Sequence, residues 1–152
     1  MGASSSIDKI KKLSMNNNTY ISYADKDRYG GILHEDLVLA GINIIQGRFI
    51  CADDPDETEL FIGAVSEIME HSDYIIICIS EKTICSFHQA IEINKALDSN
   101  KILVYIFTDM NFTPISTPYL NGLVGFNKWL PAYDGPTLAL AVEEIKSYAD
   151  IT

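Results

Sequence analysis

Short apolar runs alternate with longer amphipathic segments along this chain from Thr19 onward. Two runs, Tyr74–Ile79 and Ile102–Phe107, are apolar at almost every position. Only a strand that is covered on both faces tolerates such a run, because the side chains of a strand alternate between its two faces. Shorter runs of the same kind predict three further strands, at Thr19–Tyr23, Ile42–Ile45 and Leu123–Phe126.

Four segments carry apolar residues at the three- and four-residue spacing of a helix. The first has Leu33, Leu37 and Ala40 on one face, with Asp25 or Asp27 as its N-cap and Gly41 at its end. The second segment has inward positions at Phe61 (or Leu60), Ala64, Val65, Ile68 and Met69. The third, about His88–Asp98, has them at Ala90, Ile93, Ala96 and Leu97. The last has them at Leu138, Val142, Ile145 and Tyr148.

Repeated strand–helix units with doubly buried central strands predict a three-layer α/β sandwich around a parallel sheet. With five strands, the flavodoxin-like order 2-1-3-4-5 is the commonest arrangement, and its crevice opens where strands 1 and 3 separate. That geometry brings the segment Tyr23-Ala24-Asp25 together with the loop Ser80–Ser86 and the start of the third helix. The sequence therefore predicts a functional site at this point.

Length and charge narrow the class of protein. The 152 residues fit a domain over 19–152 and a flexible or amphipathic tail over 1–18. The net charge of −10 disfavours nucleic-acid binding, although a few local donors still suffice for a small dinucleotide.

Three cysteines form neither a disulfide framework nor a zinc site, and Cys78 is expected to be a small buried apolar residue. The acidic run 53–57 lacks the pattern of a calcium loop, and helix capping is the expected role of its carboxylates.

The first residues carry a lipidation pattern. Met1-Gly2-Ala3-Ser4-Ser5-Ser6 matches an N-myristoylation signal with Gly2 as acceptor, and a plain flexible start is the equal alternative. One acyl chain binds membranes only marginally, so Lys9, Lys11 and Lys12 would supply the second signal. No apolar stretch approaches a membrane span, and no secretory signal is present. The expected location is the cytoplasm, with membrane contact if Gly2 is acylated.

The order of these segments resembles that of TIR domains over roughly Thr19 to Tyr148. Ile21-Ser22-Tyr23 is similar to the first box of the family, and the run His71–Ser80 is similar to the segment that leads into its third helix. Ser86 is followed six residues later by Glu92, where the family has Ser-x-Trp-Cys-x-x-Glu-Leu. The loop Gln46–Asp56 lies at the position of the BB loop of the family.

This resemblance implies an enzyme that cleaves the nicotinamide–ribose bond of NAD in immune or cell-death signalling. NAD is then the substrate, with no prosthetic group and no metal, and Glu92 is the essential carboxylate. The substrate contacts implied are Tyr23, Ala24, Asp53, Ser86 and His88. The resemblance also implies self-association or contact with other TIR domains, through Gly47, Arg48 and Phe49.

Other interpretations stay open at this stage. Glu92 is otherwise a solvated carboxylate on a helix rim, Ser80 and Ser86 are turn and cap residues, and Tyr23 caps the sheet. His88 replaces the tryptophan of the family, Gln89 its cysteine, and Ala24 a polar residue. These differences favour a non-catalytic interaction module, an adaptor or a decoy. A third interpretation is a binder of nucleotide-derived signals that uses the same cleft without turnover.

Overall fold

The computed structural model describes residues 18–46, 58–110 and 129–148, which form a five-stranded sheet and the helices around it. All the strand pairs are parallel, and the order is β2-β1-β3-β4-β5. The predicted flavodoxin-like arrangement is therefore confirmed. The strands are β1 (Asn18–Ser22), β2 (Asn43–Ile45), β3 (Tyr74–Ile79), β4 (Ile102–Phe107) and β5 (Trp129–Pro131).

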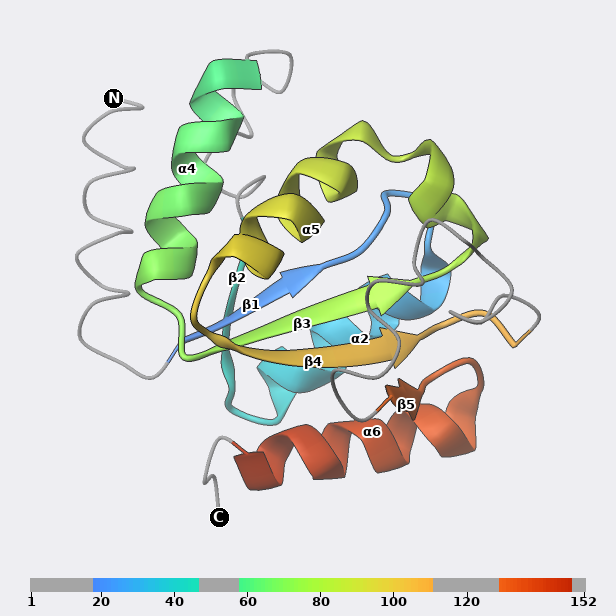
Figure 1. Ribbon diagram of the computed structural model, residues 1–152. Coiled ribbons are helices and arrows are strands. Elements are labelled where there is room, and N and C mark those ends of the chain that lie inside the picture. The colour runs from blue at the N-terminus through green and yellow to red at the C-terminus, as the bar shows by residue number, and fades with distance from the viewer. Residues whose placement is uncertain (1–17, 47–57, 111–128, 149–152) are drawn as a thin grey trace.

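Helices cover both faces of the sheet, as Figure 1 shows. On one face lie α4 (Thr58–Glu70) and α5 (Phe87–Asp98), and on the other lie α2 (Arg28–Leu39) and α6 (Gly135–Tyr148). A short 3-10 helix, η1 (Glu81–Cys85), connects β3 to α5. None of the helices in the described parts of the chain is long and apolar enough to cross a membrane.

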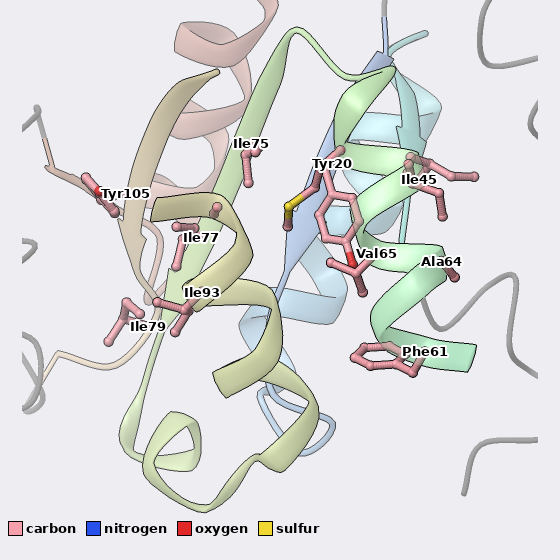
Figure 2. Close-up of a cluster of buried hydrophobic side chains, with 13 residues drawn as sticks. Tyr20, Ile45, Phe61, Ala64, Val65, Ile75, Ile77, Ile79, Ile93 and Tyr105 are labelled. Carbon is pink, nitrogen blue, oxygen red and sulfur yellow. The ribbon is translucent and has the colours of Figure 1, made fainter. Parts of the chain in front are cut away.

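The alternation of side chains along the strands produces two separate cores. Tyr20, Ile75 and Ile77 point toward α4 and α5, whereas Ile21 and Ile76 point toward α2 and α6. Figure 2 shows the first of these cores, with the Tyr20 ring beside α4 and the β3 side chains beside α5. Every residue of β3 after its first is buried, which confirms the prediction of a strand covered on both faces.

The predicted start and end of α2 are confirmed. Asp27 is the N-cap, and its carboxylate accepts a hydrogen bond from the Gly30 amide. The helix is followed by Gly41 in the left-handed region, with φ of 92°. A residue without Cβ adopts this conformation at little cost, which is why glycine commonly follows a helix end.

The fifth strand of the described sheet is Trp129–Pro131, and the predicted strand Leu123–Phe126 lies outside the described residues. The inner face of the third helix needs correction. Leu97 was expected to face inward, but 46% of its surface is exposed, and Ala90 is only partly buried. Their places on the inner face of α5 are taken by the polar residues Gln89 and Glu92. Strand β1 begins at Asn18, one residue before the predicted start at Thr19, and Asn18 is buried.

Candidate functional site

The site lies where β1 and β3 separate, at the carboxyl edge of the sheet. The ladder between these strands ends with the pair Ser22 and Ile77, while β3 continues to Ile79 against β4. Beyond Ser22 the chain turns away to cap α2. Carbonyl groups near this point therefore lose the strand partner that would otherwise satisfy them.

A pocket of about 330 Å³ opens beside this separation. Its walls come from the turn after β1, from η1 and from the first turn of α5, which confirms the predicted meeting of these three segments. The lining residues are Ala24, Asp25, Lys26, Lys82, Ser86, Phe87 and His88. A cavity of this size is at the lower end of the range for small-molecule sites.

Ser80 and Ser86 act as helix caps. The Ser80 side chain accepts a hydrogen bond from the Lys82 amide and forms a capping box with Thr83, at the start of η1. The Ser86 hydroxyl accepts a hydrogen bond from the Gln89 amide, 3.1 Å away, at the start of α5. The cap interpretation is therefore confirmed for both serines, and Ser86 lines the pocket as well.

His88 packs between two phenylalanine rings. It meets Phe61 of α4 edge-on with 4.8 Å between the ring centroids, and it meets Phe87 at 6.1 Å. The His88 ring thus occupies the junction of α4 and α5 and also lines the pocket. Phe87 is 62% exposed at the same place, so the pocket has an apolar rim on this side.

Glu92 is completely buried on the inner face of α5. Its carboxylate accepts hydrogen bonds from the Tyr20 hydroxyl and from the Ser22 hydroxyl, the latter at 2.8 Å. The alternative of a solvated rim carboxylate is therefore wrong. Removing a carboxylate from water costs several kcal/mol unless hydrogen bonds compensate, and the two hydroxyls provide that compensation.

Tyr23 lies on the opposite face of the sheet from Glu92. Its hydroxyl is 2.9 Å from Nδ1 of His34, and its ring meets the His34 ring edge-on. Its Cβ also packs so close to Gly30 that a side chain there would not fit. Tyr23 therefore points away from Glu92, because consecutive strand residues point to opposite faces, although the turn that follows Tyr23 lines the same pocket as the first turn of α5.

Gln89 contacts the ends of both strands at their separation, and it was not among the predicted site residues. Its side-chain Nε2 donates to the carbonyl oxygen of Cys78 at 2.6 Å and to that of Ser22 at 3.3 Å. Its Oε1 is buried and has no hydrogen-bond partner among the described residues. A buried acceptor without a donor costs about 1–3 kcal/mol, so this oxygen of Gln89 lowers the stability of the folded protein.

Cys78 and Asp27 lie on the far side of this strand junction. Burial raises the pKa of the Cys78 thiol well above its usual value, and the Asp27 and Glu92 carboxylates raise it further. The thiol is therefore unreactive, and Cys78 is the small buried residue that was predicted. Asp27 also accepts a hydrogen bond of 2.5 Å from the Thr108 hydroxyl, which ties the turn after β1 to the end of β4.

A larger cavity of about 420 Å³ lies at the opposite edge of the sheet. It is formed by the last turns of α4 and α5 and by the chain before β4, and it includes Glu70, Lys95 and Lys101. None of the predicted site residues lines it. We assign the site to the smaller pocket because the carboxyl ends of the strands and the strand separation lie there. Glu92 is completely buried and does not itself line this pocket.

Several predicted residues lie outside the described part of the chain. These are the lipidation residue Gly2, the interaction residues Gly47, Arg48 and Phe49, and the substrate residue Asp53. Within the described residues, no group of three or more His, Cys, Asp or Glu side chains is placed to hold a metal ion.

Comparison of the chain with models of known protein families finds no match, and comparison with curated proteins finds none either. The resemblance to TIR domains therefore rests on the sequence motifs described above.

Proposed function

We propose that this protein is a TIR-type enzyme that hydrolyses or cyclises NAD at the nicotinamide–ribose bond, with Glu92 as the essential carboxylate. The observation that carries the proposal is the complete burial of this glutamate beside the strand separation. An apolar residue would fill the same helix position at lower cost. A carboxylate that is kept in such a place is a functional-site candidate.

The chemistry of the reaction suits this residue. Cleavage of the N-glycosidic bond builds positive charge on the ribose, and a nearby carboxylate in a water-poor site stabilises that charge. Nicotinamide leaves without protonation because its ring is already cationic in NAD. In this proposal the ribose hydroxyls replace those of Tyr20 and Ser22 at the carboxylate oxygens. Water or an adenine nitrogen then attacks the sugar.

The charge of the pocket suits the diphosphate of NAD. Lys26 and Lys82 line it together with one carboxylate, Asp25, whereas the chain as a whole has 11 basic residues against 21 acidic ones. The 12-residue helix α5 also begins at the pocket, and its first amides favour an anion. This local field opposes the negative charge of the whole chain.

The test is nicotinamide release from NAD by concentrated purified protein, with the product identified by chromatography. We expect Glu92→Gln to lower the rate by about 10²–10³-fold with the fold unchanged by circular dichroism. Glu81→Gln is the control, because Glu81 is exposed on η1. Full activity of Glu92→Gln would remove Glu92 from the mechanism.

A second candidate is a non-catalytic interaction module. The protein hydroxyls that enclose Glu92 favour it, and so do the exposed apolar residues Phe87 (62%) and Leu60 (49%). This function predicts no NAD turnover at any concentration. It also predicts that Phe87→Ser weakens self-association in sedimentation experiments. Leu140→Ser on α6, which is 71% exposed, is the matched control on the other face.

A further inference from the structure

The Gln89 side chain connects β1 to β3 at the level where the two strands separate. One nitrogen atom donates to the carbonyl oxygens of Ser22 and Cys78, at 3.3 and 2.6 Å. The two protons of this amide suit two acceptors, one on each strand. Gln89 therefore adds a side-chain connection between the two strands at the last pair of their ladder, Ser22 and Ile77.

Gln89 and Glu92 both form a hydrogen bond with Ser22. Gln89 contacts its carbonyl oxygen, and Glu92 accepts from its hydroxyl at 2.8 Å. The two side chains are three residues apart on α5, so they lie on the same face of that helix. A shift of Ser22 away from Gln89 would consequently move a hydrogen-bond donor of the Glu92 carboxylate.

We propose that Gln89 is a positioning residue that holds the end of β1 so that the Ser22 hydroxyl orients the Glu92 carboxylate. The role of this orientation in catalysis rests on the function proposed above. The buried Oε1 of Gln89 supports the proposal, since it has no partner among the described residues. A side chain selected for packing alone would not carry such an atom.

The first experiment is steady-state NAD cleavage by Gln89→Met, which keeps the side-chain length and removes the amide. We expect kcat to fall about 10- to 100-fold while KM stays within about twofold, since misplacement of a catalytic group has effects of this size. Gln46→Met is the matched control. Its Nε2 also contacts a β1 carbonyl, that of Ile21 at 3.4 Å, but away from Glu92.

The second experiment asks whether Gln89 acts through Ser22. Ser22→Ala removes the hydroxyl directly, so adding Gln89→Met to it should lower kcat by less than about twofold more. Independent losses in the double variant would overturn the proposal. Gln89→Asn is a second variant, whose side chain keeps the amide but is too short to reach both strands. It replaces Gln89→Met if the Gln89→Met protein does not fold.

A third measurement does not depend on activity. The carboxyl ¹³C resonance of Glu92, assigned with Glu92→Gln, should shift in Gln89→Met and stay in place in Gln46→Met. An unchanged resonance in Gln89→Met would overturn the positioning role. An inactive wild-type protein with a shifted resonance would instead refute NAD cleavage and leave the positioning role supported.

Discussion

Replacement of Tyr20 by phenylalanine isolates one of the two hydrogen bonds to Glu92. The Tyr20 ring is completely buried in the core between the sheet, α4 and α5 (Figure 2), and phenylalanine keeps that ring. Only the hydroxyl that donates to Glu92 is lost. The substitution therefore measures what the buried carboxylate gains from this donor, with little change in packing.

The size of the effect follows from the charge of the acceptor. Hydrogen bonds to charged groups contribute about 1.5–3 kcal/mol, whereas neutral ones contribute about 0.5–1.5 kcal/mol. We expect Tyr20→Phe to lower the free energy of unfolding by about 1.5–3 kcal/mol. For a domain of this size that is a decrease in Tm of about 3–12 °C. In a Glu92→Gln background the same substitution should cost about 1 kcal/mol less.

The assay is urea denaturation at pH 7 of the wild type, both single variants and the double variant. The double-mutant cycle yields the coupling free energy between Tyr20 and Glu92, provided that the m-values agree. An equal cost of Tyr20→Phe in both backgrounds would show that the hydroxyl does not interact with a charged carboxylate. The account of Glu92 as a compensated buried charge would then be refuted.

Two further predictions concern the opposite face of the sheet. Gly30→Ala would place a methyl group 2.7 Å from the Tyr23 side chain, so it should destabilise the protein by about 1–3 kcal/mol in thermal melts. At Gly31 the nearest neighbour of an added methyl group is 4.0 Å away, so Gly31→Ala should stabilise the protein by about 0.5–1 kcal/mol. Burial lowers the pKa of His34 from 6.5, so the folded state binds fewer protons than the unfolded state below that pH. The free energy of unfolding should therefore be unaffected by His34 above pH 6.5 and should decrease as the pH falls below it. His34→Gln should remove this part of the decrease in urea titrations at several pH values.

The sheet was predictable from the sequence because its central strands are buried on both faces. The run Tyr74–Ile79 has no polar position, and this pattern fits few structures other than a covered parallel strand. The alternation of elements predicts a parallel sheet, the commonest order for five strands is the one found, and that order determines where the crevice opens. Asp27 and Gly41 were recognisable because capping and left-handed backbone favour particular residue types.

The fifth strand and the direction of the Tyr23 side chain were harder to predict. Trp129–Pro131 is only three residues long and contains a proline, so it lacks a strand signal of its own. It forms because β4 offers it an edge, a tertiary effect that a local pattern does not encode. Tyr23 was placed on the wrong side for a different reason, since the motif comparison ignored the alternation of side chains along β1.

The polar inner face of α5 has its origin in the geometry of the sheet. Over its second half, the helix covers the paired part of the strands and presents Ile93 and Ala96. Over its first half, it lies above the ends of β1 and β3, where these two strands stop pairing with each other and carbonyl groups need donors. Gln89 meets that need, and Glu92 between the two halves accepts the hydroxyls of the strand beneath it. A search for apolar periodicity selects Leu97 in place of these residues, because it assumes that a buried face is apolar. The two polar residues that such a search misses, Gln89 and Glu92, are therefore those that contact the strand ends where β1 separates from β3.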